Sequence, residues 1–198
     1  MEILPGAVVL LSLERFFYIW LCREPWRFAE WCRIPWSKRP FDPVLGVEAL
    51  FYVFKAVQLI VVIWWCFAFG GRIWPPVVEP MAITIGALLL ASGQLLSAVA
   101  FRRLGRIGVF YGGQFGYPVQ WQREFPFSWF RHPQYVAGVA SIWGAMMILR
   151  YPAPDWIVLP IIQTIYYWLG ARLESYRHAA DLRIRMNGVE LIDRDQIV

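Results

Sequence analysis

Two polar motifs, the first of them rich in glycine, interrupt an otherwise apolar sequence. The first reads Gly-Val-Phe-Tyr-Gly-Gly-Gln-Phe-Gly over 108–116, and the second reads Arg-His-Pro-Gln-Tyr-Val-Ala-Gly over 131–138. Pro133 at the start of a helix has a preset φ and no amide hydrogen, so the amides and the dipole of that first turn are available to an anion such as a cofactor carboxylate. Glycines let the backbone approach a bulky ligand or adopt a positive φ. The first motif supplies four of them, Gly108, Gly112, Gly113 and Gly116.

Charged side chains near these motifs could complete a cofactor site. Arg131 and His132 add donors beside Pro133, and Glu174 could accept from a ligand ammonium or from ribose hydroxyls. Simpler interpretations exist for each feature. The glycines can serve close helix packing in a membrane, the Arg-His-Pro motif can be an ordinary helix start, and Glu174 can pair with a neighbouring arginine. The combination at one surface, developed below, is what favours the site.

Five apolar blocks predict the elements that position the motifs. The chain has 198 residues and is 59% hydrophobic. A helix needs about 20 apolar residues to cross a bilayer, where the backbone has no water to bond. The blocks are roughly 3–22, 46–69, 81–101, 135–149 and 156–171. We therefore expect one all-α integral membrane domain over 1–198, with about five transmembrane helices.

The first and the last two blocks need comment. The first lacks a basic start and contains Glu14 and Arg15, so we expect a helix rather than a signal peptide. The last two are short for a hydrocarbon core of about 30 Å, which indicates a thin local bilayer, tilted neighbours or ends that fray into the interface.

Basic residues orient the predicted bundle. The segments 23–45, 102–134 and 172–198 each carry five Lys or Arg, whereas the other two connections carry only Arg72 and Arg150. The positive-inside rule places the three basic segments in the cytosol, with the N-terminus outside. Both motifs and Glu174 then share the cytosolic surface, where we expect the cofactor pocket and the C-terminus. The membrane is a bacterial inner membrane or the endoplasmic reticulum.

The net charge of +5 predicts contact with an anionic leaflet rather than with nucleic acid. Four prolines break the segment 23–45, which is rich in tryptophan, so we expect short aromatic helices along the headgroups. The three cysteines have neither metal-ligand spacing nor a disulfide framework, and we expect no metal. Glu14 and Lys55 lie at matching depth, about 12–14 Å inside their predicted helices at 1.5 Å per residue. Because an isolated charge there is costly, we predict that these two side chains pair.

The motifs resemble those of the phospholipid N-methyltransferases. The resemblance rests on 108–116, on Glu-Phe-Pro-Phe over 124–127, on 131–138 and on Leu-Glu-Ser over 173–175. It extends over roughly 54–176 and is closest to the short plant and fungal type, which methylates phosphatidyl-monomethyl- and dimethylethanolamine. A looser likeness links the chain to the isoprenylcysteine carboxyl methyltransferases. The resemblance implies S-adenosylmethionine as methyl donor and an ethanolamine phospholipid as acceptor.

The resemblance also implies which residues bind the cofactor. Where animal members carry Gly-x-Gly in the third helix and Glu-Glu after the last, this chain reads Ala91-Ser92-Gly93 and Leu173-Glu174. Gly93 and Glu174 carry over directly, whereas contacts at Ala91 and Leu173 would use the backbone or packing. Gln94 adjoins this motif, although such a residue is more often a buried hydrogen-bond partner. The complete predicted cofactor set is Ala91, Ser92, Gly93, Gln94, Gly112, Arg131, His132, Pro133, Tyr135, Gly138, Leu173 and Glu174.

Methyl transfer from a sulfonium to an amine is an in-line displacement, so the protein must align the reactants and exclude water. The headgroup ammonium must first lose a proton, which a nearby base can accept. Glu124 and His132 rank above Tyr111 as that base, although spacing does not choose among them. Arg106 and Arg123 are candidates for the lipid phosphate, because a guanidinium matches two phosphate oxygens.

Two alternative functions stay open at this point. The acceptor could be another membrane molecule, such as a prenylated cysteine carboxylate or an isoprenoid. The chain could also be a non-catalytic lipid-binding or assembly subunit, which the altered residues at Ala91 and Leu173 would suit. Failure to bind S-adenosylmethionine would be the signature of that second alternative.

Overall fold

The computed structural model describes residues 3–33, 41–75, 77–119 and 122–173, and within these ranges it is helical without strands. The labelled elements are α1 (Ile3–Arg23), α2 (Pro25–Arg33), α3 (Pro43–Gly70), α4 (Pro80–Val109), the 3-10 turn η1 (Gly112–Phe115), α5 (Pro133–Arg150) and the 3-10 turn η2 (Pro154–Ile157). A further helix covers residues 158–173 as far as the chain is described.

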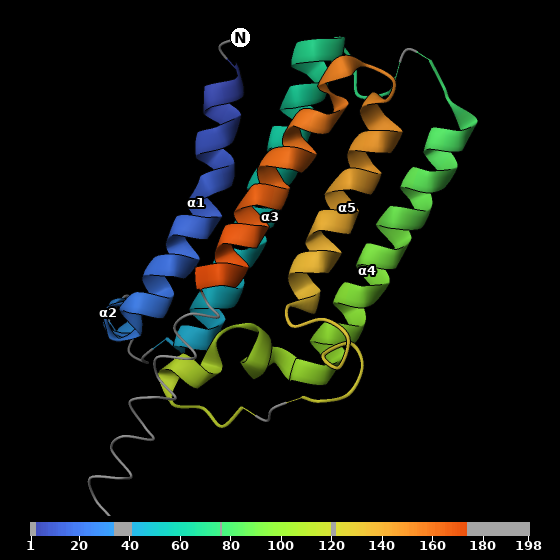
Figure 1. Ribbon diagram of the computed structural model, residues 1–198. Coiled ribbons are helices and arrows are strands. Elements are labelled where there is room, and N and C mark those ends of the chain that lie inside the picture. Colours follow the sequence, from blue (N-terminus) through green and yellow to red (C-terminus); the bar gives the residue numbers. More distant parts are fainter. Residues whose placement is uncertain (1–2, 34–40, 76, 120–121, 174–198) are drawn as a thin grey trace, which may run out of the picture.

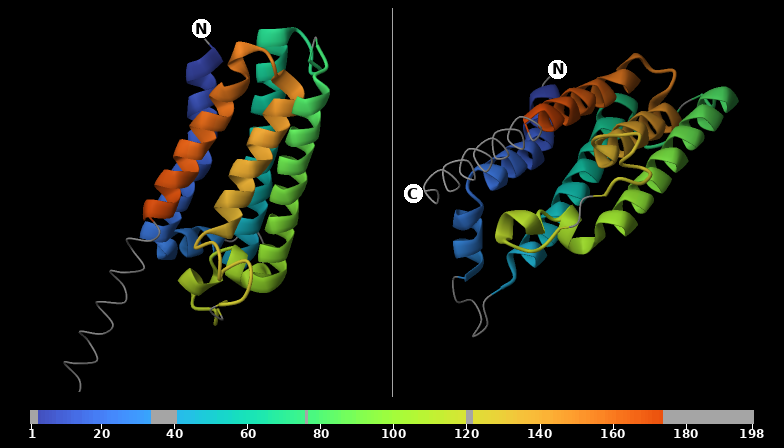
Figure 2. Two further views of the ribbon diagram at one scale, coloured as in Figure 1. Left: turned by 45° about the vertical axis from the view of Figure 1, so that its right-hand side comes forward. Right: turned by 60° about the horizontal axis from the view of Figure 1, so that its bottom comes forward.

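The long helices α1, α3, α4, α5 and 158–173 run side by side, and α2 lies across one end of the bundle (Figure 1). The end of α1, the start of α3, the end of α4, the start of α5 and the end of the described helix 158–173 lie at that same end, and the other ends of these helices lie at the opposite end (Figure 2). We call the first of these the basic end. The described parts of the three segments that carry the sequence motifs therefore lie at one end of the molecule.

Three helical segments are long and apolar enough to cross a membrane, namely Ile3–Arg23, Pro43–Gly70 and Pro80–Phe115. Their outward faces carry large apolar side chains, among them Leu59 and Ile60 on α3 and Leu88 on α4. Such extensive apolar surface requires an apolar surrounding. The fold is thus that of a helical membrane protein, in which α5 and residues 158–173 lie along the three candidate spans.

Two helices extend beyond their predicted apolar blocks. Asp42 caps the start of α3 by accepting a hydrogen bond from the Val44 amide at 2.9 Å, so α3 begins at Pro43 rather than near residue 46. The α4 helix continues past Phe101 to Val109, with a kink at Gly105, where φ is 65°. Hydropathy falls after Phe101 because arginines follow, but arginine is a good helix former and does not end the helix.

Glycines bring α4 and α5 into close contact. A Cβ at Gly144 would lie 2.5 Å from the carbonyl oxygen of Gly86, and a Cβ at Gly93 would lie 2.7 Å from the carbonyl oxygen of Ala137. The two backbones therefore pass closer than any larger side chain would allow. This contact fixes the start of α5 relative to the middle of α4.

The other helices pack through two apolar clusters. One joins α1, α3 and α5 with residues 158–173 through Leu11, Val61, Trp65, Met146 and Leu159. The other, at the basic end, is largely aromatic and anchors α2 on α1 and α3. Its members include Phe17, Tyr18, Phe28, Val47, Phe110 and Tyr111. The predicted aromatic helix in the segment 23–45 is confirmed as α2, whose Trp26 and Trp31 are exposed.

At the opposite end a buried ion pair ties α5 to α3. Arg150 donates two hydrogen bonds to Asp155, at 2.9 and 2.6 Å, and the Trp65 indole donates a third at 2.9 Å. Gly70 leaves the space for the Arg150 guanidinium, since a Cβ there would overlap it. Burial alone would raise the pKa of Asp155, but the hydrogen bonds from Arg150 and Trp65 outweigh it and hold the pKa below its ordinary value.

Candidate active site

A cavity of about 540 Å³ lies inside the bundle, between α1, α3, α4, α5 and residues 158–173. This volume falls in the range of about 300–1,000 Å³ that is typical of small-molecule sites. Its walls include apolar side chains, five tyrosines (18, 52, 111, 135 and 167) and several amide and hydroxyl groups. A cavity with these polar groups inside an apolar bundle is suited to a ligand that has both apolar and polar parts.

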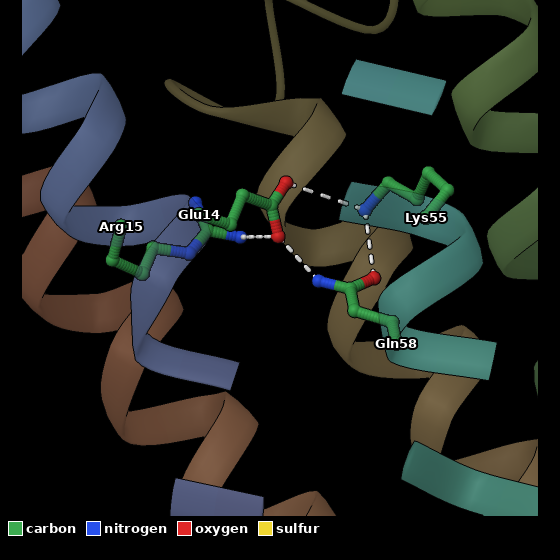
Figure 3. A network of polar contacts seen from close by, with 4 residues as sticks. All are labelled: Glu14, Arg15, Lys55 and Gln58. Carbon is green, nitrogen blue, oxygen red and sulfur yellow. Dashed lines mark hydrogen bonds and ion pairs between the residues drawn. The ribbon is translucent and has the colours of Figure 1, made fainter. Parts of the chain in front are cut away.

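A cluster of charged and amide side chains forms the α1 and α3 wall of this cavity (Figure 3). Glu14 lies 3.5 Å from the Lys55 ammonium and 3.6 Å from the Arg15 guanidinium. Gln58 donates a hydrogen bond to Glu14 and accepts one from Lys55 at 3.0 Å. The predicted pairing of Glu14 with Lys55 is confirmed. We call these four residues the buried charge cluster.

Arg15 is the most enclosed cation of the cavity, with 7% of its surface exposed. Its guanidinium carbon lies 4.0 Å from the ring centroid of Tyr167 and 5.3 Å from that of Tyr135. These ring faces favour a cation through their quadrupoles. Gly138 leaves the space in which Tyr167 lies, because a Cβ at this position would be 2.5 Å from the Tyr167 hydroxyl oxygen.

A second cavity of about 160 Å³ lies at the basic end beside the start of α5. Arg131, His132 and Pro133 line it, so the predicted helix-start motif does face a cavity. Pro133 is the first residue of α5, and the His132 ring stacks on Tyr135, with centroids 5.4 Å apart. The two cavities share wall residues, which are Val109, Tyr111, Gln134 and Tyr135.

Tyr111 stands between the two cavities in an uncommon backbone conformation. Its φ of 58° lies in the left-handed region, and its ring stacks on Tyr18 with centroids 5.4 Å apart. A tyrosine at positive φ is strained and is held there by its surroundings. Gly112 follows it inside the tight turn η1, where the Tyr117 amide donates to the Gly112 carbonyl at 3.1 Å. The glycine motif thus positions Tyr111.

The predicted cofactor residues of α4 face different directions. Gln94 lines the central cavity and donates a hydrogen bond to the Ser141 hydroxyl at 2.9 Å. Gly93 is buried against α5, whereas Ala91 and Ser92 are exposed and line neither of the two cavities. The structure therefore brings Gln94, but not Ala91 or Ser92, to the wall that Tyr135 and Gly138 also line.

The predicted residues of the loop before α5 and of the last part of α4 lie at the surface. Glu124 pairs with Arg103 at 2.5 Å, and Arg106 pairs with Glu48. Arg123 is exposed, and neither it nor Glu124 nor Arg106 lines either cavity. Their proposed roles in proton transfer and phosphate binding stay predictions.

The last predicted residues lie at the end of the described chain. Leu173 is its final residue and is exposed, and Glu174 lies outside the described residues. Among the residues that the structure does describe, no group of three or more His, Cys, Asp or Glu could hold a metal ion.

Several wall residues escaped the motif-based prediction. Three buried polar atoms of the central cavity have no hydrogen-bond partner within the described chain, and they are Arg15 Nε, Gln134 Nε2 and Gln163 Oε1. Buried polar groups in proteins are nearly always paired, so these atoms indicate a polar ligand. The signal that could have located this wall was the presence of three charges, Glu14, Arg15 and Lys55, inside apolar blocks.

Comparison with known proteins gives the family. The matching family model is that of the phospholipid methyltransferases, and it covers residues 81–178. A curated phosphatidyl-N-methylethanolamine N-methyltransferase from Arabidopsis thaliana is 30% identical over 142 residues, which are 72% of this chain and 76% of that protein. The chain belongs to the phospholipid methyltransferase family, as its motifs indicated. No solved structure matches it.

This membership makes the protein a membrane methyltransferase whose cavity lies inside the bundle. The matched family region begins at residue 81 and so includes α4, α5 and the helix 158–173. The buried charge cluster comes from α1 and α3, which precede that region. One wall of the cavity therefore comes from the region that matches the family model, and the other comes from α1 and α3, the first two long helices.

Proposed function

We propose that the protein transfers methyl groups from S-adenosylmethionine to the amine of phosphatidylethanolamine or its mono- and dimethyl derivatives, toward phosphatidylcholine. The family and the name of its relative support methylation of an ethanolamine phospholipid. The single observation that carries the proposal is the pair of adjoining cavities, one inside the apolar bundle and one at its basic end. A lipid headgroup and a water-soluble donor can meet there from opposite directions.

The residues at the basic end fit the proposed methyl donor. The start of α5 offers amides and the positive end of a helix dipole, and Arg131 adds a cation, which together suit a carboxylate. The ring faces of Tyr111 and Tyr135 on the shared wall suit a cationic sulfur.

When bound, S-adenosylmethionine supplies a methyl group whose carbon–sulfur bond breaks as a bond to the amine nitrogen forms, with the bonding electron pair left on sulfur. The enclosed walls of the central cavity orient the lipid amine and exclude water from it. Burial in the apolar central cavity disfavours the ammonium form of the headgroup, so the attacking amine is more easily deprotonated there.

The proton that leaves the amine needs an acceptor near the shared wall. We propose His132 for this role, because it lines the smaller cavity and stacks on Tyr135, which lines both. Tyr111 is the second candidate, since its ring stands between the cavities. Glu124 ranks after both because its carboxylate is engaged by Arg103.

We further propose that the basic end faces the cytosol, in a bacterial inner membrane or the endoplasmic reticulum. The connections at this end, together with the helix ends that adjoin them, hold most of the arginines of the described chain, and such residues favour the cytosolic side. The methyl donor would then reach the smaller cavity directly from the cytosol.

Labelled S-adenosylmethionine and vesicles test the proposed function. The purified protein is incubated with vesicles that contain phosphatidylethanolamine, its monomethyl form or its dimethyl form, and the products are separated by headgroup. We expect label in at least one of the three lipids. Label in none of them would reject the proposal, and label only in the latter two would restrict the enzyme to the later methylation steps.

A further inference from the structure

The central cavity reaches the side of the bundle between α3 and α4. On α3, Tyr52 and Leu59 line the cavity and are nevertheless 59% and 60% exposed. On α4, Gln94 lines the opposite rim and is also exposed. The two helices make little direct contact except near the basic end, where Phe51 packs on Phe101 with centroids 6.0 Å apart. We call this opening the side portal.

Helix periodicity explains how the portal forms. Residues 51, 55, 58 and 62 of α3 and residues 90, 94, 97 and 101 of α4 all line the cavity. Each set follows the spacing of three and four residues that defines one face of a helix. Both helices are candidate membrane spans, so the portal opens at the depth of the hydrocarbon and is suited to a lipid. A water-soluble ligand would enter at the basic end instead.

The wall that faces a molecule in this portal carries excess positive charge. Of the described residues that line the cavity, Arg15 and Lys55 are cationic and Glu14 alone is acidic. Glu14 has 3% of its surface exposed, and it is shared by both cations. One positive charge is therefore left without a balancing anion inside an apolar bundle, where such a charge is costly. An anionic group of a ligand would neutralise it.

The unpartnered atoms match both ends of a zwitterionic headgroup. Arg15 Nε and Gln134 Nε2 are donors without acceptors in the described part of the chain, and phosphate oxygens are acceptors. Gln163 Oε1 is an acceptor without a donor there, and an ethanolamine nitrogen carries N–H donors. A free anion would satisfy only the first pair. An ethanolamine phospholipid carries hydrogen-bonding partners of the right kind for all three atoms.

We propose that the acceptor phospholipid enters through the side portal and that Arg15 and Lys55 bind its phosphodiester, which positions the amine for methylation. This inference rests on the proposed function and adds the phosphate subsite to it. Arg15 and Lys55 are positioning residues, since they hold the phosphate and not the reacting nitrogen.

Kinetics of substituted proteins test the phosphate subsite. The concentration of phosphatidyl-N-methylethanolamine in mixed micelles is varied at saturating S-adenosylmethionine, and in a second series S-adenosylmethionine is varied at saturating lipid. The proteins compared are wild type, Lys55→Gln, Lys55→Arg, Glu14→Gln and the exposed control Arg72→Gln. We expect Lys55→Gln to raise the lipid KM by roughly tenfold, because the substitution removes one charge-assisted hydrogen bond. The KM for S-adenosylmethionine stays unchanged, and Lys55→Arg restores most of the lipid affinity.

Glu14→Gln separates phosphate binding from simple ion pairing. Removing the carboxylate leaves both cations free for the phosphate, so we expect a lipid KM that is equal to or below that of wild type. If the cluster only stabilises the fold, Lys55→Gln and Glu14→Gln will both lower Tm and will impair both KM values alike. That result would overturn the inference.

Competition provides a readout that does not depend on folding of the Glu14 variant. Retention of phosphatidyl-N-methylethanolamine by the purified wild type is measured by mass spectrometry against three competitors. We expect phosphatidic acid to displace it, whereas diacylglycerol, which lacks the phosphate, and glycerophosphoethanolamine, which lacks the acyl chains, do not. Equal displacement by diacylglycerol would overturn the phosphate subsite, and displacement by glycerophosphoethanolamine would overturn entry of the lipid through the portal.

The outcomes distinguish this inference from the proposed function. If wild type methylates none of the ethanolamine phospholipids, the proposed function fails. If wild type methylates them and Lys55→Gln leaves the lipid KM unchanged, only the phosphate subsite fails.

Discussion

Tyr167 connects the buried cation of the central cavity with α5, the helix that carries the predicted cofactor motif. The Arg15 guanidinium lies over its ring, and Tyr135 packs beside it with ring centroids 5.4 Å apart. A Cβ on Gly138 would overlap the Tyr167 hydroxyl and ring, at 2.5 and 2.6 Å. One missing side chain in α5 therefore sets the position of two aromatic rings and, through them, of Arg15.

Gly138→Ala tests this arrangement at the residue scale. The new methyl group displaces Tyr167, so we expect a loss of about 1–3 kcal/mol in stability from overpacking. We also expect kcat/KM to fall by roughly tenfold or more, because small displacements misalign reacting groups. Gly170→Ala is the matched control, since its Cβ would make only an ordinary contact, 3.7 Å from Tyr135. Equal stability and activity of the two variants would contradict the assigned role of Gly138.

Asp155 gives a prediction about pH. Its folded-state pKa is lowered, so its contribution to stability is complete above the unfolded pKa of about 3.9 and is lost as the pH falls through the folded value. Asp155→Asn leaves the buried Arg150 without its partner, and at neutral pH we expect it to cost about 3–5 kcal/mol.

Thermal unfolding in detergent between pH 7 and pH 3 measures this effect. We expect the difference in Tm between wild type and Asp155→Asn to shrink as the pH falls below the ordinary aspartate value. Glu79→Gln, an exposed carboxylate at the same end that makes no capping hydrogen bond, is the control. A constant difference across the whole range would show that Asp155 does not titrate as described.

At the scale of elements, the contact between α4 and α5 holds together the cavity wall that is formed by the matched family region. Its closest point is the pair of Gly86 and Gly144, whose backbones touch without intervening side chains. Gln94 and Ser141 then bridge the same two helices by a hydrogen bond of 2.9 Å. The start of α5, with its helix-start motif, is positioned by this contact because α5 has no freedom to shift along α4.

Gly144→Ala should separate the two helices. Its Cβ would lie 2.5 Å from a carbonyl oxygen and 2.6 Å from a backbone nitrogen of α4. Backbone atoms cannot move aside in the way that the end of a flexible side chain can. We expect a loss of about 1–3 kcal/mol and weaker binding of S-adenosylmethionine by the purified protein. Calorimetric titration measures the binding. Unchanged affinity would show that the smaller cavity does not depend on this helix contact.

Hydropathy predicted the positions of the long helices well, because a spanning segment must be both helical and apolar. It placed the end of α4 at Phe101 instead of Val109, since it detects the end of apolar sequence and not the end of the helix. The Glu14–Lys55 contact was predictable for a different reason. Two charges at one depth in an apolar medium have few other partners.

The inward face of each helix could not be predicted in the same way. Lipid and protein interior are equally apolar, so hydropathy does not indicate which side of a spanning helix turns inward. Gln58 and Gln163 were therefore missed, although both line the cavity. The pairing of Glu124 with Arg103 was also not predictable, because the path of a loop is not encoded in the spacing of its residues. The role of Glu124 as a base stays a prediction.

At the scale of the whole molecule, the bundle is asymmetric along its axis. The basic end holds α2, the η1 turn and the smaller cavity, whereas the opposite end is held by the pair of Arg150 and Asp155. The central cavity lies between these ends, and the proposed side portal lies between α3 and α4. In the proposed function, a soluble donor and a membrane lipid therefore use separate entrances to the same cavity.

This asymmetry predicts which face of the membrane supports the reaction. In sealed vesicles from expressing cells, S-adenosylmethionine added outside should label lipid only when the basic end faces outward, because the donor is charged and does not cross the bilayer. We expect activity in inverted vesicles, and in right-side-out vesicles only after detergent permeabilisation. A protease-cleavable tag placed after Val198 reports the orientation independently of activity. Cleavage of the tag together with labelling in intact right-side-out vesicles would show that the basic end lies outside, opposite to the orientation that its arginines favour.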